Sequence, residues 1–164
     1  MSRMTIPWKP TKLGNPDAKP DGILDRFPGT YGTDVTLECT EFTCRCPVTK
    51  QPDWATITVH YVVNQRIVES KSVKLFLETY RDTGIFHEHL AWELLEAFVA
   101  ALDPLSCTVI VRFNSRGGIA ITAKASYQPT GHSRLRRARA PSCRVLRKGD
   151  PLFDKLPKYK KVPV

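Results

Sequence analysis

The chain has 164 residues, of which 41% are hydrophobic and 25% are charged, as is typical of one soluble globular domain. It contains no apolar run long enough to cross a bilayer, and it opens without the apolar core of a signal peptide. We therefore expect a cytoplasmic protein with no membrane partner. Its five cysteines are odd in number and irregularly spaced, which argues against a disulfide framework.

The formal net charge of +9 comes from the C-terminal end of the chain. Residues 124–164 hold 12 lysines and arginines against two aspartates, whereas residues 1–123 carry a net charge of −1. The arginine-rich run at 134–148 could bind RNA or another polyanion. A solvated tail, or a tail that lies over an acidic neighbouring subunit, would carry the same charge. We therefore do not expect a nucleic-acid partner, although the tail leaves this open.

The first part of the chain predicts an arm followed by two strands. Residues 1–30 are rich in proline, glycine and aspartate and are predicted to form an extended N-terminal arm. In residues 33–42, and again in 54–63, apolar side chains alternate with polar ones, which predicts two half-buried strands. The segment between them, residues 44–53, contains two cysteines and would connect the strands at one end of a sheet.

The second part of the chain predicts two helices and two more strands. In residues 70–81 and 84–104 the apolar side chains recur at helical spacing. Residues 107–113 and 118–127 return to the pattern of strands, and the glycine-containing segment between them is typical of a hairpin turn.

The order of these elements, ββααββ, predicts the fold class. It is typical of an α+β layer, in which an antiparallel four-stranded sheet carries both helices on one face. The predicted domain spans residues 31–130, between the arm of residues 1–30 and a basic C-terminal tail of residues 131–164. The other face and both edges of such a sheet need to be covered, so we expect a homo-oligomer.

Four separate motifs, in this order along the chain, resemble those of one enzyme family. They are CPVTKQPDWAT (46–56), VESKSVKLF (68–76), FHE (86–88) and RGG (116–118). From about residue 13 to residue 127 the chain resembles the NADPH-dependent 7-cyano-7-deazaguanine reductases of the QueF type, in their short single-module form. The resemblance implies a tunnelling fold (T-fold) and a cytoplasmic enzyme that reduces a nitrile to an amine in tRNA queuosine biosynthesis, with NADPH as cofactor. It also implies a decamer of two pentameric rings, with active sites between subunits.

The first of these motifs carries the implied chemistry. A thiolate can add to a nitrile carbon and form a thioimidate, which divides a difficult reduction into easier steps. The resemblance makes Cys46 this nucleophile, makes Asp53 the acid that protonates the nitrile nitrogen, and places His87 near the nitrile and the cofactor. Outside such a motif, Cys46 would more often be an inert buried thiol. Lys50 stands where glycine is common in the family.

The other motifs are implied to bind the two ligands. For the substrate, the resemblance points to Glu88 at the edge of the base, Phe86 close to the base, and Glu69 and Ser70. For the cofactor, it points to Lys71, Ser72, Lys74, Arg116 and Gly117. Free N–H groups at the helix start would add to the phosphate site. Without the other motifs, the lysines would be read as a solvated helix face and Glu88 as an acidic residue of a first helical turn. The implied reaction requires no metal.

Three alternatives remain open at this point. A zinc-dependent, cyclohydrolase-like enzyme could use Cys44, Cys46, His87 and His89 as ligands. A T-fold amidinotransferase would form the same thioimidate but would accept ammonia in place of hydride, and it would lack the NADPH motif. An RNA-binding module would depend on the basic tail and would survive the loss of Cys46.

Overall fold

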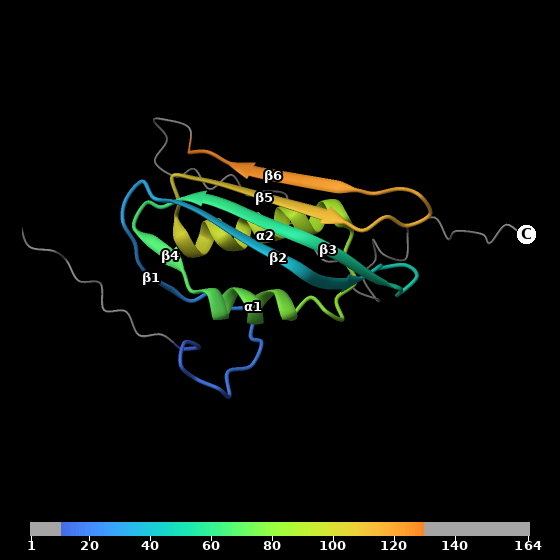
Figure 1. Ribbon diagram of the computed structural model, residues 1–164, viewed down its shortest axis with the longest axis horizontal. Helices are drawn as coiled ribbons and strands as arrows, with labels where there is room; N and C mark the ends of the chain where they lie inside the picture. Colours follow the sequence, from blue (N-terminus) through green and yellow to red (C-terminus); the bar gives the residue numbers. More distant parts are fainter. Residues whose placement is uncertain (1–10, 130–164) are drawn as a thin grey trace, which may run out of the picture. The chain divides into compact units, whose positions relative to one another are not determined.

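The computed structural model describes residues 11–129. Residues 1–10 and 130–164 lie outside the described part, so the predicted basic tail stays a prediction. The elements, labelled in Figure 1, are β1 (Arg26–Pro28), β2 (Asp34–Arg45), β3 (Pro52–Val62), β4 (Arg66–Val68), α1 (Ser70–Glu78), α2 (His87–Leu102), β5 (Ser106–Phe113) and β6 (Thr122–Tyr127).

Four of these strands form the predicted antiparallel sheet. Their order is β2-β3-β5-β6, so each strand pairs with its neighbour and β2 and β6 are the outer strands. Helix α2 packs across β5 and β6, while α1 lies against β2 (Figure 1). The predicted α+β class and the ββααββ order are confirmed. Neither helix among residues 11–129 is long and apolar enough to span a membrane.

The alternation in β3 explains why the sheet has one core face. Ile57, Val59 and Tyr61 are each at most 2% exposed, whereas Trp54 on the opposite face is 51% exposed. Successive side chains of a strand point to opposite faces, so the buried set forms one continuous surface. That surface joins the apolar sides of both helices in a single core cluster, which includes Phe76, Tyr80, Leu90, Leu94 and Phe98.

A second, two-stranded sheet was not among the predicted elements. In it, β1 pairs antiparallel with β4, so that Arg26 stands opposite Val68. Strands of three residues are too short to show a recognisable alternation, which is why the sequence pattern does not reveal them. The pairing fixes the end of the predicted N-terminal arm beside the start of α1.

Three predicted elements prove shorter in the structure, and one of them, the helix predicted over residues 84–104, runs only from His87 to Leu102. Helix α1 ends at Glu78, because residues 79–83 continue as tight turns in which the Thr79 and Tyr80 N–H groups donate to carbonyls of the last helical turn. Strand β6 begins at Thr122, four residues after Gly118. Gly117 and Gly118 have φ angles of 58° and 81°, which belong to the left-handed region and form the hairpin turn.

Candidate active site

The connection between β2 and β3 is a tight loop that presents Cys46. The Cys46 N–H donates to the Gln51 carbonyl at 2.9 Å, and the Lys50 N–H donates to the Cys46 carbonyl at 3.0 Å. Lys50 has a φ of 63°, a left-handed conformation that favours glycine, which explains why glycine suits this position in the family it resembles. The closed loop holds the Cys46 thiol at the end of the sheet where β2 and β3 are connected, and the thiol is partly buried there.

Hydrogen bonds to Cys46 favour its thiolate. Partial burial pushes the pKa of the Cys46 thiol upward, but hydrogen bonds from the hydroxyl and N–H of Thr49 and from the N–H of Val48 outweigh it, so the pKa is lowered. The Thr49 N–H lies 3.5 Å from the Cys46 sulfur. Stabilising the anion in this way makes the Cys46 thiol a better nucleophile near neutral pH than an unperturbed thiol.

Asp53 lies at the start of β3, and only one of its two side-chain oxygens has a hydrogen-bond partner among the described residues. Its side chain is only 2% exposed, and Oδ1 accepts a hydrogen bond from Nη1 of Arg116. Its other oxygen, Oδ2, is buried and has no hydrogen-bond partner among the described residues. On that side, His87 Nε2 lies 3.6 Å from Oδ2. A buried polar atom without a partner is costly, and in a native protein it calls for an explanation such as a catalytic role.

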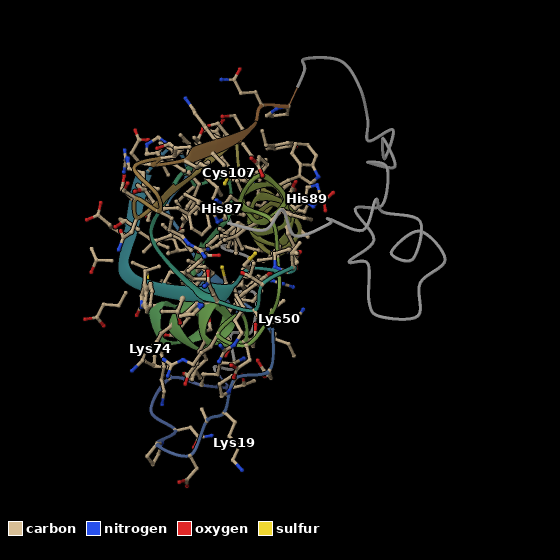
Figure 2. The ribbon with its side chains drawn as sticks, turned by 90° about the vertical axis from the view of Figure 1, so that its right-hand side faces the viewer. Lys19, Lys50, Lys74, His87, His89 and Cys107 are labelled. Carbon is tan, nitrogen blue, oxygen red and sulfur yellow. The ribbon has the colours of Figure 1, made fainter. Side chains whose placement is uncertain are left out.

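His87 is held in place by a stacked aromatic ring. Its imidazole lies parallel to the ring of Phe113 on β5, with centroids 3.6 Å apart and planes 15° apart. His87 is the first residue of α2, and its side chain is about one-fifth exposed. The structure therefore brings His87 to Asp53, as the predicted catalytic set requires, and Figure 2 shows it inside the layer between the sheet and α2.

Arg116, which was predicted to bind the cofactor, makes its side-chain contacts with residues of the Cys46 loop and of β3. Its guanidinium donates to Asp53 through Nη1 and to the Gln51 side-chain oxygen through Nη2. The next residue, Gly117, belongs to the exposed hairpin turn after β5. Gln51 was not singled out from the sequence, although it stands between Cys46 and Asp53 in the first motif; only the folded hairpin brings Arg116 to it.

Cys44 lies close to the site but differs chemically from Cys46. It is fully buried, and burial, together with the negative charges of Asp53 and Cys46, raises its pKa to about 12. At neutral pH it is therefore a thiol and not a thiolate. All four described cysteines are free, so Cys44 and Cys46 form no disulfide here.

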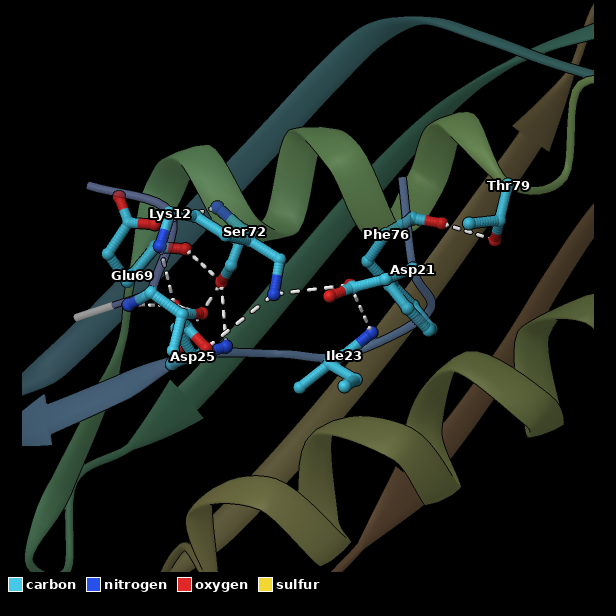
Figure 3. A network of polar contacts seen from close by, with 9 residues as sticks. Lys12, Asp21, Ile23, Asp25, Glu69, Ser72, Phe76 and Thr79 are labelled. Atoms are coloured by element: carbon cyan, nitrogen blue, oxygen red, sulfur yellow. Dashed lines mark hydrogen bonds and ion pairs between the residues drawn. The ribbon is translucent and has the colours of Figure 1, made fainter. Parts of the chain in front are cut away.

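The start of α1, with Glu69 and Ser72, is committed to internal contacts, as Figure 3 shows. The Glu69 carboxylate caps the helix by accepting hydrogen bonds from the N–H groups of Lys71 at 2.7 Å and Ser72 at 2.8 Å. The Ser72 hydroxyl is buried, donates to the Glu69 carbonyl and accepts from the Asp25 N–H. The expectation that free N–H groups here help to bind phosphate is wrong, because the carboxylate already occupies them.

The two lysines of α1 differ in their surroundings. Lys71 donates through Nζ to the backbone carbonyl of Asn15, which leaves its positive charge uncompensated. Lys74 lines a groove of about 430 Å³ between β2 and α1, together with Ser70 and Arg81. Neither the Lys74 nor the Arg81 side chain has a hydrogen bond or ion pair with another described residue. Lys74 lies well apart from His87 in Figure 2.

Phe86 and Glu88 stand exposed at the start of α2. Phe86 is 45% exposed and meets the ring of His89 edge-on at 5.8 Å, while Glu88 is the acidic residue of the first turn. In the single chain, therefore, one group of predicted residues (Cys46, Asp53, His87 and Arg116) comes together. The residues at the start of α1 and those of the groove form a separate group.

The zinc alternative finds no ligand set in the described part of the chain. Among residues 11–129, no three histidine, cysteine, aspartate or glutamate side chains are grouped so that they could hold a metal ion.

Comparison with known proteins places the chain in a family. The family described as "QueF-like protein" matches residues 52–131. The NADPH-dependent 7-cyano-7-deazaguanine reductase of Frankia casuarinae is 54% identical over 119 residues, which cover 72% of this chain and 95% of that protein. The chain belongs to this reductase family. Proteins of the same name from Syntrophus aciditrophicus and Thermomicrobium roseum are 45% and 44% identical, and the matches cover 82% and 73% of this chain and 93% and 96% of theirs.

A solved structure supports the fold of this reductase-family chain. The archaeosine synthase QueF-Like, in its apo form, matches with a TM-score of 0.57 and 26% identity, over 62% of this chain and 99% of that one. The predicted family and T-fold class are thereby confirmed. The roles of the individual site residues stay predictions.

Proposed function

We propose that this chain reduces the nitrile of 7-cyano-7-deazaguanine to the primary amine, 7-aminomethyl-7-deazaguanine, with NADPH as the reductant. The reaction serves queuosine biosynthesis in tRNA, and we propose that it takes place in the cytoplasm. The observation that carries the proposal is the pairing of a thiol of lowered pKa with a buried carboxylate whose second oxygen has no partner. Membership of the reductase family supports both the substrate and the cofactor.

The chain's own residues account for activation of the nitrile. The Cys46 sulfur attacks the nitrile carbon, so that a C–S bond forms while one π bond of the C≡N group breaks. The Cys46 thiol passes its proton to Asp53 Oδ2, the oxygen left without a hydrogen-bond partner, and that oxygen then gives the proton to the nitrile nitrogen, so that the product is a thioimidate. His87, at 3.6 Å from that oxygen, is placed to return a proton to Asp53. When bound, NADPH supplies the hydrides that reduce the thioimidate and then the imine released from Cys46.

The cations on α1 fit the phosphate groups of NADPH. Lys71 has an uncompensated charge, and Lys74 is exposed without a partner among the described residues. We propose that these two side chains hold the phosphates as point charges. Glu69 and Ser72 support them at the start of α1, because the Glu69 carboxylate caps the helix and the Ser72 hydroxyl donates to the Glu69 carbonyl.

Glu88 and Phe86 are proposed to bind the base. A carboxylate can accept two hydrogen bonds from the N–H groups of a guanine-like edge, and an exposed aromatic ring can stack on the base. Both side chains are exposed at the start of α2 in the single chain. We propose that a neighbouring subunit covers them, in a homo-oligomer whose rings place active sites between subunits.

An amidinotransferase is the second candidate, and the similarity to the archaeosine synthase structure favours it. The two functions share the attack by Cys46 and differ in what the thioimidate accepts. The relatives of higher identity are all named NADPH-dependent reductases, which favours hydride.

The test is to mix purified protein with 7-cyano-7-deazaguanine and NADPH and to follow both the cofactor and the protein mass. We expect two NADPH to be oxidised per nitrile by the wild type and none by Cys46→Ala. Without NADPH, the nitrile should add to Cys46 alone, and Cys39, Cys44 and Cys107 serve as internal controls in the same digest. An adduct that reacts with ammonia and not with NADPH would support the amidinotransferase. Turnover that survives Cys46→Ala would contradict both candidates.

A further inference from the structure

Gln51 connects the proposed nucleophile to the proposed acid through two different groups. Its backbone carbonyl accepts the Cys46 N–H at 2.9 Å and so closes the loop that presents the thiol. Its side-chain oxygen accepts a hydrogen bond from Arg116 Nη2, while Nη1 of the same guanidinium donates to Asp53 Oδ1. A chain of contacts therefore runs from the Cys46 loop, through Gln51 and Arg116, to the Asp53 carboxylate.

Arg116 alone is poorly placed to fix Asp53. Its side chain is 41% exposed, and it lies on a hairpin where Gly117 and Gly118 both have left-handed backbone conformations. A long side chain on such a turn has many conformations to lose when it makes one bond. The guanidinium is a planar fork, however, so anchoring both of its outer nitrogens sets its plane. The Gln51 oxygen is the second anchor.

The consequence for Asp53 concerns which oxygen can carry the proton. A guanidinium has only donors, so the oxygen that it contacts, Oδ1, is held as an acceptor. The other oxygen, Oδ2, is left without a partner and lies on the side of His87. Fixing Oδ1 thus fixes the direction of Oδ2, which is the oxygen proposed to protonate the nitrile nitrogen.

We propose that Gln51 is a positioning residue of the nitrile-activating step: it sets the plane of Arg116 and thereby aims Asp53 Oδ2 at the nitrile nitrogen. This inference rests on the proposed function. It assigns a role to a side chain that touches neither the reacting sulfur nor the proton. Because the backbone carbonyl of Gln51 closes the Cys46 loop, substitutions of the side chain can test the positioning role while leaving that backbone hydrogen bond in place.

The test compares Gln51→Met, which keeps the length of the side chain and removes the acceptor, with Gln51→Glu, which keeps the acceptor. The matched control is Gln65→Met, because Gln65 is exposed and its side chain contacts no other described residue through a hydrogen bond. We measure the rate of Cys46 adduct formation without NADPH, then kcat and the KM for NADPH, and the melting temperature of each variant. The adduct rate and kcat of Gln51→Met should fall about tenfold, as expected for loss of a hydrogen bond to a charged group.

Several readouts separate positioning from stability and from cofactor binding. The KM for NADPH and the melting temperature of Gln51→Met should stay near the wild-type values, and Gln51→Glu should retain most of the adduct rate. Arg116→Lys should show the same loss of adduct rate, since an ammonium cannot hold both partners in a plane. The double variant Gln51→Met/Arg116→Lys should be no slower than Arg116→Lys, because both changes break one chain of contacts.

Other outcomes would overturn the inference. A wild-type adduct rate in Gln51→Met, or a change confined to the KM for NADPH, would mean that Gln51 does not act through Asp53. Additive losses in the double variant would mean that Gln51 and Arg116 act separately. An adduct rate of Gln51→Glu as low as that of Gln51→Met would also contradict the inference, because Gln51→Glu keeps the acceptor. Failure of the proposed function looks different, because the wild type itself would then form no adduct and oxidise no NADPH.

Discussion

At the scale of single residues, the reactivity of Cys46 depends on hydrogen bonds from its own loop. The thiol is partly buried, which by itself would raise its pKa, and the contacts from Thr49 and Val48 reverse the direction. Two cysteines that are two positions apart thus differ in the direction of their pKa shifts. The pKa of Cys46 is lowered, whereas the pKa of Cys44, near the end of β2, is raised to about 12. This difference in pKa comes from the burial of each thiol and from the hydrogen-bond donors around it, so it could not be predicted from the residue type alone.

Thr49→Val should therefore make Cys46 less reactive near neutral pH. The substitution keeps the shape of the side chain and removes the hydroxyl donor, so the pKa of Cys46 should move up towards its ordinary value. The measurement is the rate of iodoacetamide alkylation of Cys46 as a function of pH. We expect the alkylation midpoint of the variant at higher pH than that of the wild type, with Cys44 slow in both across neutral pH. A midpoint that stays in place would show that the Thr49 hydroxyl does not stabilise the thiolate.

At the scale of elements, the start of α1 is fastened to the N-terminal segment through Asp25. Its Oδ2 accepts from the Thr11 hydroxyl at 2.6 Å and from the Thr11 and Lys12 N–H groups at 3.0 and 3.1 Å. Its Oδ1 lies 3.6 Å from Nζ of Lys12, a cation whose side chain is only 3% exposed (Figure 3). Its backbone carbonyl accepts the Glu69 N–H at 2.8 Å. Asp25 therefore joins the arm to the helix that carries the two proposed phosphate-binding lysines.

Asp25→Ala should destabilise the protein and weaken cofactor binding. Removing one counter-ion of buried Lys12, together with several hydrogen bonds, should lower the free energy of unfolding by about 2–4 kcal/mol. Urea denaturation measures this loss, and Asp17→Ala is the control because Asp17 is exposed and its carboxylate makes no described contact. In conditions where the variant is folded, we expect a higher KM for NADPH with a nearly unchanged kcat. Equal unfolding free energies for the two variants would contradict the role of Asp25.

The ion pair between Asp25 and Lys12 predicts how the free energy of unfolding changes with pH. Burial tends to raise the pKa of Asp25, but the hydrogen bonds from Thr11 and the charge of Lys12 lower it overall. A carboxyl whose pKa is lower in the folded state adds stability above its unfolded value, near ~3.9, and loses that stability as the pH falls through the folded value. This acid-dependent part of the stability should be absent from Asp25→Ala.

Local patterns predicted most of these elements, and long-range contacts account for the rest. The strands around Ile57 and Val109 and the helix around Leu94 show clear periods, and all three are present. The three-residue strands β1 and β4 have too few positions to show a period. The motifs identified Cys46, Asp53 and Arg116 by residue type. The contact of Arg116 with Asp53 could not be predicted, because it depends on the register that pairs β3 with β5.

At the scale of the whole molecule, the described surface leaves the proposed site incomplete. Glu88 is exposed, and so are Trp54, Phe86 and Trp92, which are 51%, 45% and 41% exposed. Exposed large aromatic side chains are enriched at protein–protein contacts. The outer strands β2 and β6 also present unpaired backbone groups that a second copy could pair. These features support the proposal of active sites between subunits, and we propose in addition that Glu88 of one subunit serves Cys46 of another.

Mixing two inactive variants tests whether the site is shared. Cys46→Ala lacks the nucleophile and Glu88→Gln weakens recognition of the base, so each alone should have little activity. In a random equal mixture of subunits, about a quarter of interfaces would combine an intact Cys46 with an intact Glu88 from the neighbour, which should restore activity to that order. The variants are unfolded together in urea, refolded and assayed for nitrile-dependent NADPH oxidation, with each variant refolded alone as the control. If Glu88 and Cys46 act within one chain, each mixed oligomer still contains only defective sites, and the mixture should remain as inactive as its parts.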